Sequence, residues 1–262
     1  MEHPLEVTGE INNSFYDEYG DRWYTAYDDP VALLRAENQT KFPWILNKLK
    51  ALSFPGARIL DVGCGGGFLS NELACHDFKV TGVDLSPESL KVACQYDKTK
   101  TVIYEVADAY QLPFSDEAFD VVTAMDFLEH VEGPEKVIKE FSRVLKPGGL
   151  FFFHTFNRNF LSWLIVIKLL EWFVKNTPKN MHVLNLFIKP RELSYFCESS
   201  GMKVLSCTGI RPVFTSIDWN MIKTGVVSKN MRFTLTKGLL LSYMGVARKT
   251  TNSTLSKQHF QH

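Results

Sequence analysis

The central part of the chain alternates between short apolar blocks and longer segments in which apolar residues repeat at helical spacing. A short apolar block bounded by turn residues indicates a buried strand, and the longer repeats indicate amphipathic helices. Alternating elements of this kind predict an α/β fold with an open, mostly parallel, doubly wound sheet. The expected strands lie near 58–62, 80–83, 102–106, 119–124 and 150–154, and the expected helices near 68–75, 87–94 and 134–145.

Local signals mark the ends of several elements. Ser86-Pro87-Glu88 combines an N-capping serine with proline at the first helical position. The sequence Lys146-Pro147-Gly148-Gly149 is predicted to end the helix that begins near residue 134. Further along, Phe187–Leu193 is expected to begin another helix, and 202–210 and 240–248 are predicted to form two closing strands.

Two segments outside this alternation are also predicted to be helical. Aromatic and apolar residues recur at roughly helical spacing over residues 14–52, which predicts N-terminal helices. Residues 160–175, after the fifth strand, carry only Lys168, Glu171 and Lys175 as charges, and their apolar positions nearly encircle a helix. This insertion is too short to span a bilayer, so it is either a buried lid helix or an interfacial helix.

Composition narrows the class of protein. The chain has 262 residues, of which 45% are hydrophobic and 22% charged, and its formal net charge is zero. The length suits one α/β domain with insertions, and the charge balance argues against nucleic acid as a partner. Five irregularly spaced cysteines indicate neither a disulfide framework nor a zinc site, and no signal peptide is visible, so we expect a cytoplasmic location.

A glycine-rich turn follows the first strand of the alternation. Asp61 ends this strand, and Gly63, Gly65, Gly66 and Gly67 then let a ligand lie directly on the main chain. No Gly-Lys-Ser/Thr follows, which disfavours a nucleoside triphosphate.

The second strand ends in another acid. Asp84 lies 21 residues after Gly63, at about the distance from which an acid binds ribose hydroxyls in dinucleotide folds. NAD would fit this arrangement in part, but Phe68 stands where its third glycine belongs.

Several motifs taken together resemble those of class I S-adenosylmethionine-dependent methyltransferases. They are Asp61-Val-Gly-Cys-Gly-Gly-Gly67, Asp84, Asp108-Ala109, Phe119-Asp120-Val-Val122 and Leu145-Lys-Pro-Gly-Gly149. The resemblance covers residues 55–155 and implies a Rossmann-like fold and S-adenosylmethionine as cofactor. By this likeness Gly63 and Gly65 pass under the methionine moiety, Asp84 holds the ribose, and Asp108 faces the adenine amino group. The cofactor-binding set that it implies is Lys41, Asp61, Gly63, Gly65, Asp84, Leu85, Asp108, Ala109 and Met125, with Lys41 supplying charge for the cofactor carboxylate.

Chemistry beyond the cofactor is expected at the end of the fourth strand. Asp126, Glu129 and His130 are spaced i, i+3, i+4, and on a helical turn these side chains share one face. Two carboxylates and an imidazole there form either an acid/base group or the ligands of a divalent cation such as Mg²⁺, Mn²⁺ or Zn²⁺. His154 is predicted to be a core residue and His76 a surface residue.

The chain as a whole resembles the ubiquinone-biosynthesis O-methyltransferases. The residues that carry this likeness are Arg22-Trp23, Asp126-x-x-Glu129-His130, Asn157-Arg158-Asn159, Pro178-Lys-Asn-Met-His182 and Phe187-Ile-Lys-Pro-Arg-Glu-Leu193. The resemblance implies methylation of a phenolic hydroxyl on a polyprenylated phenol or catechol. Relatives carry Glu-x-x-Glu-His and need a divalent metal, whereas here Asp126 is shorter by one methylene. The implied catalytic residues are His130, Glu129 and His182, the last as a second base or a further ligand.

These expectations combine into one picture of the chain. A single domain spans 1–249, with a helical cap (14–52), a cofactor-binding core (55–155), a lid or membrane-contact insertion (157–200), and closing strands with an acceptor loop (201–249). Residues 1–13 and the tail 250–262 are expected to be disordered. A lipophilic acceptor would give residues 160–175 a peripheral contact with the inner face of the membrane. The alternatives are a methyltransferase of another lipophilic acceptor, a non-catalytic S-adenosylmethionine-binding protein and, more remotely, a nicotinamide oxidoreductase.

Overall fold

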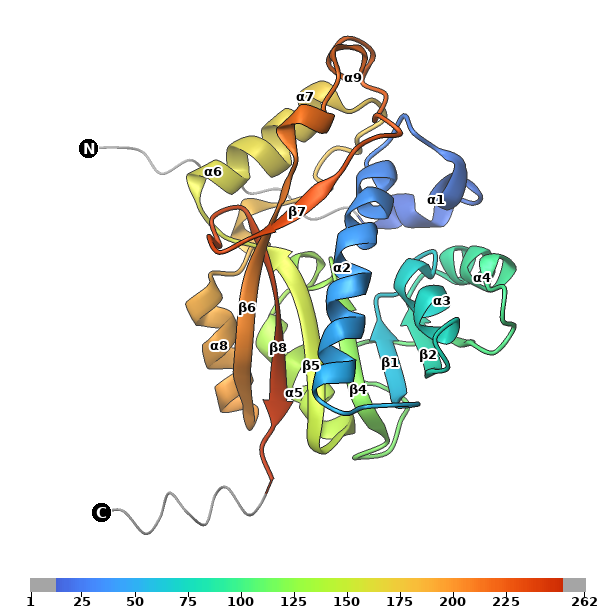
Figure 1. Cartoon of the computed structure of the whole chain (residues 1–262), viewed down its shortest axis with the longest axis vertical. Helices are drawn as coiled ribbons and strands as arrows, with labels where there is room; N and C mark the ends of the chain where they lie inside the picture. The colour runs from blue at the N-terminus through green and yellow to red at the C-terminus, as the bar shows by residue number, and fades with distance from the viewer. Residues whose placement is uncertain (1–12, 252–262) are drawn as a thin grey trace, which may run out of the picture.

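The computed structural model describes residues 13–251, which form an eight-stranded sheet covered by helices (Figure 1). The strand order is β3-β2-β1-β4-β5-β8-β6-β7. The strands are β1 (Arg58–Val62), β2 (Lys79–Asp84), β3 (Ile103–Val106), β4 (Phe119–Met125), β5 (Leu145–Phe156), β6 (Met202–Pro212), β7 (Phe233–Thr236) and β8 (Ser242–Lys249). β1 to β5 pair in parallel, and β8 runs antiparallel to both β5 and β6. The predicted doubly wound, mostly parallel sheet is therefore confirmed.

The sheet changes direction of winding between β1 and β4. β1 pairs with β2 on one side and with β4 on the other, so the connections on the two sides lead away from a common point. Ligands of open α/β sheets bind at such a switch point, beyond the carboxyl ends of the strands. The sequence motifs after β1, β2 and β4 therefore meet at one edge of the sheet.

Helices cover both faces of the sheet, and their apolar side chains pack against those of the strands. On one face, Ile45 and Leu49 of α2 (Val31–Ala51) and Leu73 of α3 (Phe68–Ala74) pack on the strands with Ile59 of β1. On the other face lie α5 (Pro134–Val144) and α8 (Pro190–Ser199), with Phe141 of α5 fully buried. α4 (Pro87–Tyr96) follows β2.

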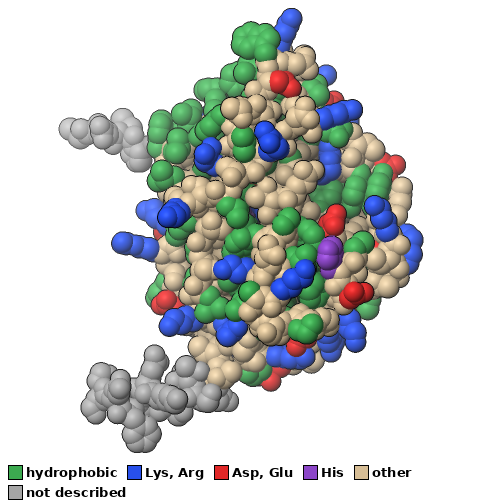
Figure 2. All heavy atoms as spheres, in the orientation of Figure 1, with side chains coloured by type: hydrophobic (Ala, Val, Ile, Leu, Met, Phe, Trp, Pro, Cys, Tyr) green, Lys and Arg blue, Asp and Glu red, His purple; other side chains and the backbone are tan. Residues whose placement is uncertain are grey.

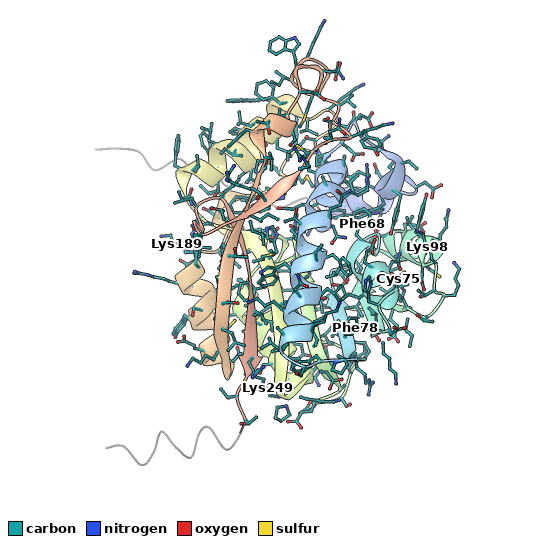
Figure 3. All side chains as sticks on the ribbon, in the orientation of Figure 1. Phe68, Cys75, Phe78, Lys98, Lys189 and Lys249 are labelled. Carbon is teal, nitrogen blue, oxygen red and sulfur yellow. The ribbon has the colours of Figure 1, made fainter. Side chains whose placement is uncertain are left out.

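The predicted helix ends are mostly accurate, with one exception. Ser86 caps α4, since its Oγ accepts a hydrogen bond from the Ser89 N–H at 3.1 Å. The helix that begins at Pro134, however, ends at Val144, so the Lys-Pro-Gly-Gly segment lies within β5. Gly149 permits this because a Cβ there would lie 2.9 Å from the Asp120 carbonyl oxygen. At the end of β8, Lys249 Nζ donates a hydrogen bond to the Leu145 carbonyl oxygen at the start of β5 (Figure 3).

The N-terminal segment is helical, as predicted. A 3-10 helix η1 (Ser14–Glu18) and the short α1 (Arg22–Thr25) precede α2. α2 lies along the sheet, whereas η1 and α1 lie near α4 at the edge that holds the sequence motifs (Figure 1).

The segment after β5 is more irregular than the sequence indicated. It comprises α6 (Phe160–Ser162), a π-helix η3 (Trp163–Leu169), α7 (Leu170–Phe173) and the 3-10 turn η4 (Leu184–Leu186). Sequence patterns gave no indication of η5 (Phe214–Ser216), α9 (Trp219–Thr224) or β7, because each has fewer than two turns or only a few strand residues. No helix between residues 13 and 251 has the length and apolar run needed to span a bilayer.

Two expectations concern the chain ends and the cysteines. The predicted disorder of 1–13 and 250–262 falls largely outside the described residues. Thr250, which is described, donates a backbone hydrogen bond to the Gly201 carbonyl oxygen at an N···O distance of 2.9 Å. All five cysteines lie inside the described part of the chain, and all are free there.

Candidate active site

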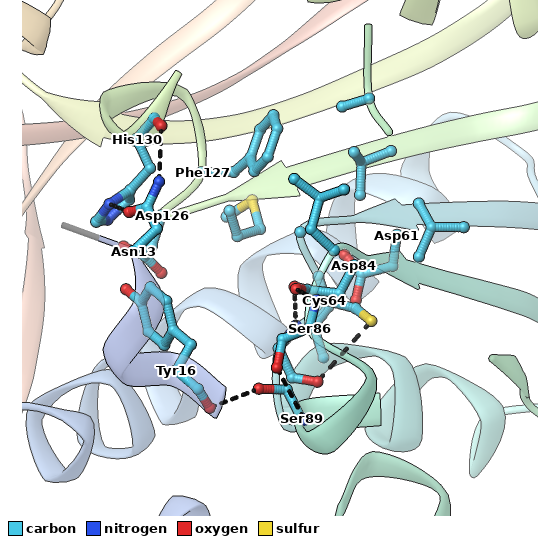
Figure 4. Close-up of a pocket in the computed structure, with 18 of the residues that line it drawn as sticks. Asn13, Tyr16, Asp61, Cys64, Asp84, Ser86, Ser89, Asp126, Phe127 and His130 are labelled. Atoms are coloured by element: carbon cyan, nitrogen blue, oxygen red, sulfur yellow. Dashed lines mark hydrogen bonds between the residues drawn. The ribbon is translucent and has the colours of Figure 1, made fainter. Parts of the chain in front are cut away.

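A cavity of about 250 Å³ opens at the switch point of the sheet (Figure 4). Its walls come from the turns after β1, β2, β3 and β4, from α2, and from the N-terminal segment. All nine residues that the resemblance placed around the cofactor line this cavity: Lys41, Asp61, Gly63, Gly65, Asp84, Leu85, Asp108, Ala109 and Met125. Parallel strands bring these residues together although they are spread over 85 positions of sequence.

The glycines of the turn after β1 are required by both conformation and packing. Gly63 and Gly65 have φ of +67° and +51°, in the left-handed region that favours glycine. A Cβ at Gly63 would lie 2.3 Å from the Phe127 ring, and one at Gly65 would lie 2.7 Å from the Trp23 ring. The glycine turn is thus packed between two aromatic rings, that of Phe127, which follows β4, and that of Trp23 in α1.

The two strand-end acids have different surroundings. Asp84 accepts hydrogen bonds from the Gly65 and Ser86 N–H groups, both at 2.9 Å, and its burial raises the pKa of the carboxyl. Asp61 is more enclosed, since it accepts 2.6 Å hydrogen bonds from the hydroxyls of Ser70 and Thr123. Burial raises the pKa of Asp61 to about 6. Both acids line the cavity, and Asp61 is held by side-chain hydroxyls whereas Asp84 is held by backbone N–H groups.

We expect Asp84→Ala to weaken binding of S-adenosylhomocysteine about 100-fold, because hydrogen bonds to a charged group contribute about 1.5–3 kcal/mol each. Isothermal titration calorimetry measures this affinity. Asp116→Ala is the matched control, because Asp116 pairs with Arg143 at the surface and lies outside the cavity wall. Equal affinities in the two variants would contradict a ribose-binding role for Asp84.

Asp126 does not join Glu129 and His130, which corrects the predicted metal-binding set. Its φ is +56°, and only Leu128–His130 forms a 3-10 turn, so the one-face spacing of a helix does not apply here. The carboxylate instead contacts Lys41 Nζ at 2.5 Å and His154 Nδ1 at 2.6 Å.

Four side chains form a polar network behind the cavity: Glu37, Lys41, Asp126 and His154. Glu37 lies one helical turn before Lys41 and accepts from its ammonium at 2.8 Å. The two carboxylates raise the pKa of Lys41 despite its burial, and Lys41 and His154 hold the pKa of Asp126 far below its usual range. His154 is fully buried, as predicted, but it belongs to this network rather than to an apolar core.

A second group brings together the three predicted catalytic residues. Glu129, His130 and His182 each offer a ligand atom, and these atoms lie within 4.8 Å of one another. His182 comes from the loop before η4, and its ring centroid lies 5.4 Å from that of His130. Among the described residues, neither Glu129 oxygen nor His182 Nδ1 has a hydrogen-bond partner of standard geometry, although all three atoms are buried.

Burial determines the protonation of this group in the ligand-free protein. It lowers the pKa of His130 to about 4 and that of His182 to about 3, so both imidazoles are neutral at pH 7. Burial, reinforced by Asp126, raises the pKa of Glu129 to about 8. His130 also lines the cofactor cavity, and it therefore connects that cavity to Glu129 and His182.

Several residues of the site were not predicted from the sequence. The contact of Glu37 with Lys41 could have been predicted, since their i, i+4 spacing on a helix favours an ion pair. The positions of Asn13 and Tyr16 in the cavity wall could not have been predicted, because the N-terminal segment reaches the cavity only through the tertiary fold.

Known proteins share this fold and much of this sequence. A model of the methyltransferase domain matches residues 60–153. The structure of a SAM-dependent methyltransferase from Methanosarcina mazei superposes with a TM-score of 0.57 at 22% identity, covering 80% of this chain and 99% of that one. A protein from Pyrococcus horikoshii OT3 gives a TM-score of 0.59 at 23% identity, with 89% and 99% covered. These likenesses show that the chain has the fold of class I methyltransferases, with a methyltransferase domain over residues 60–153.

Two curated relatives are more similar in sequence. The ubiquinone biosynthesis O-methyltransferase of Azoarcus sp. is 35% identical over 201 residues, which cover 74% of this chain and 83% of the relative. The protein of the same name from Idiomarina loihiensis is 39% identical over 197 residues, with 72% and 78% covered. The chain belongs to the family of ubiquinone biosynthesis O-methyltransferases.

Proposed function

We propose that this protein transfers the methyl group of S-adenosylmethionine to a phenolic hydroxyl of a polyprenylated phenol or catechol in ubiquinone biosynthesis. The observation that carries the proposal is the position of His130. It lines the cofactor cavity and at the same time lies beside Glu129 and His182, so an acceptor that reaches His130 also reaches the bound cofactor.

The reaction requires approximation and removal of one proton. Methyl transfer from a sulfonium is an in-line displacement, and holding the two reactants together can lower a barrier by about 7–11 kcal/mol. A phenol with a pKa near ~10, as in tyrosine, must also lose its proton. His130 is neutral, so its unprotonated nitrogen can either take this proton as a general base or bind a cation that stabilises the phenolate, with His182 as the second imidazole of the group.

On the cofactor side, Asp84 binds the ribose hydroxyls, and Asp108 with Ala109 contacts the adenine. Leu85, which is 68% exposed, covers the mouth of the cavity, and Met125 covers the adenosyl group from β4. Lys41 is the residue for the cofactor carboxylate. Its ammonium already contacts both oxygens of Asp126 and one oxygen of Glu37, so a bound cofactor carboxylate would take the place of one of these three contacts.

A divalent cation fits the Glu129, His130 and His182 group. Within residues 13–251 the buried oxygens of Glu129 and Nδ1 of His182 have no hydrogen-bond partner of standard geometry, so these atoms can act as ligands. One carboxylate and two imidazoles suit Zn²⁺ or Mn²⁺ better than Mg²⁺, which prefers oxygen ligands. A cation held by these residues would supply Lewis acidity that lowers the pKa of the phenol.

The test is methyl transfer from labelled S-adenosylmethionine to a short-tailed prenyl catechol. We expect turnover that EDTA abolishes and that Zn²⁺ or Mn²⁺ restores more fully than Mg²⁺ does. In Glu129→Gln the added metal should no longer restore turnover, whereas Glu132→Gln, an exposed control in the same loop, should behave like the native protein. Cofactor binding without turnover on any catechol would overturn the proposal and favour a different lipophilic acceptor.

We also propose that the protein contacts membrane lipid. A surface that we call the apolar tip comprises exposed aromatic and aliphatic residues of α6–α7, the η5–α9 segment and the loop before β8: Phe160, Trp172, Phe214, Trp219 and Leu240. Figure 2 shows hydrophobic side chains over these elements with basic side chains among them. Val166 and Ile167 of the same insertion are buried, so the insertion has one face in the core and one face outward. Exposed tryptophans beside lysines are typical of interfacial helices.

Trp172→Glu and Trp219→Glu should each weaken binding to anionic phospholipid vesicles tenfold or more, because burying a large apolar side chain contributes about 1.5–3 kcal/mol. Vesicle flotation measures this binding. Tyr195→Glu is the control, since Tyr195 is an equally exposed aromatic residue on α8, away from the apolar tip. If the tryptophan variants float as the native protein does, lipid contact through this surface is excluded.

A further inference from the structure

Asn13, from the segment before η1, makes a paired contact with His130 across the mouth of the cavity (Figure 4). Its Nδ2 donates to the backbone carbonyl oxygen of His130 at 3.2 Å. Its Oδ1 lies 3.1 Å from Nδ1 of the same residue. One amide therefore contacts both the main chain and the ring of the candidate base.

This geometry determines which nitrogen of His130 carries the hydrogen. A backbone carbonyl can only accept, so the amide nitrogen of Asn13 must face it and the amide oxygen must face the ring. An amide oxygen can only accept as well, so Nδ1 of His130 must be the donor. The neutral imidazole then has its lone pair on Nε2.

The N-terminal segment is held in place by contacts of its own. Ser89 of α4 donates its hydroxyl to the Tyr16 carbonyl at 3.1 Å and accepts the indole N–H of Trp23 at 3.2 Å. The Tyr16 ring stacks on Trp23 with centroids 5.6 Å apart, and its edge meets the His130 ring at 5.9 Å. These contacts fix Asn13 relative to the glycine turn and to α4, two elements of the cofactor cavity.

We propose that Asn13 is a positioning residue that holds His130 in the Nδ1–H tautomer and so leaves Nε2 as the nitrogen that accepts the acceptor's proton or binds a cation. The inference rests on the proposed function of His130. It assigns a role in the reaction to the N-terminal segment, which lies outside the region matched by the methyltransferase domain model. A second hydrogen bond that fixes the tautomer is a general feature of histidines that act as bases or ligands.

The test reads the tautomer directly, in the ligand-free and metal-free protein, from long-range ¹H–¹⁵N correlations of the His130 ring. We expect the Nδ1–H form in the native protein and in Asn13→Asp, which keeps an acceptor beside Nδ1. In Asn13→Leu, which has no acceptor, we expect the Nε2–H form that free imidazole side chains favour in water. The His130 signals are identified by their absence in His130→Gln.

Turnover provides the second readout. For Asn13→Leu we expect kcat to fall about tenfold, the effect of one hydrogen bond, with Asn13→Asp less affected. The Nε2–H form in the native protein, or an unchanged tautomer in Asn13→Leu, would overturn the proposal. So would a changed tautomer with unchanged kcat. Because the spectrum needs no substrate, it remains decisive if the protein methylates no catechol, an outcome that would reject the proposed function instead.

Discussion

His130→Ala is expected to lower kcat for methyl transfer about 10²–10⁴-fold, the usual contribution of a positioned general base. The reason is the place of His130 between the cofactor cavity and the Glu129–His182 pair. If the histidine removes the proton, its loss affects the chemical step far more than it affects cofactor binding. The measurement is single-turnover methyl transfer at saturating S-adenosylmethionine, combined with calorimetric titration of S-adenosylhomocysteine.

His76→Ala is the matched control for this experiment. His76 is an exposed histidine between α3 and β2, outside the cavity wall, and its Nδ1 contacts only the Glu72 carbonyl among the described residues. Its replacement should leave kcat unchanged. A kcat of His130→Ala equal to that of His76→Ala would contradict a catalytic role for His130, and a parallel loss of cofactor binding would indicate a collapsed cavity.

Lys41→Met is expected to lower the free energy of unfolding by about 3–5 kcal/mol, the cost of removing one partner from a buried ion pair. Lys41 is 2% exposed and contacts two carboxylates, so its loss leaves Glu37 and Asp126 buried with like charges. Urea denaturation followed by tryptophan fluorescence measures the effect. Because the ion pair depresses the pKa of Asp126, its stabilisation persists above the ordinary aspartate pKa of about 3.9 and is lost only at lower pH.

Lys91→Met is the surface control. Lys91 pairs with Glu88 on α4, but both side chains are largely exposed, so we expect a change below about 1 kcal/mol. The double variant Lys41→Met/Asp126→Asn should recover part of the lost stability, since it removes one of the two unpaired charges. If Lys41→Met and Lys91→Met have the same stability, the network of Glu37, Lys41, Asp126 and His154 does not stabilise the fold.

Local sequence was sufficient for the glycine turn and the strand-end acids of the cavity. Strand periodicity located β1, β2, β3 and β4, and each motif there follows directly from the end of its strand. Parallel strands place their carboxyl ends at one edge, so residues as distant as Asp61 and Asp108 had to meet once the sheet was correctly predicted.

The region after β4 shows where local reasoning fails. The spacing of Asp126, Glu129 and His130 predicted that the three side chains share one face of a helix. Instead, the backbone at Asp126 has a positive φ, and its carboxylate contacts Lys41 and His154. No short-range pattern encodes that choice, because both partners come from other elements and an unpaired buried carboxylate would be costly.

By itself, therefore, the sequence determined the fold class, the glycine turn and the strand-end acids that line the cavity, all of which depend on periodicity and strand ends. Tertiary structure alone decided which side chains complete the reactive group. It joined His182 to Glu129 and His130, separated Asp126 from them, and brought Asn13 to the His130 ring. Contacts between elements that are distant in sequence depend on how whole helices and loops pack against one another. Because this packing involves the entire folded chain, no single segment of the sequence encodes it.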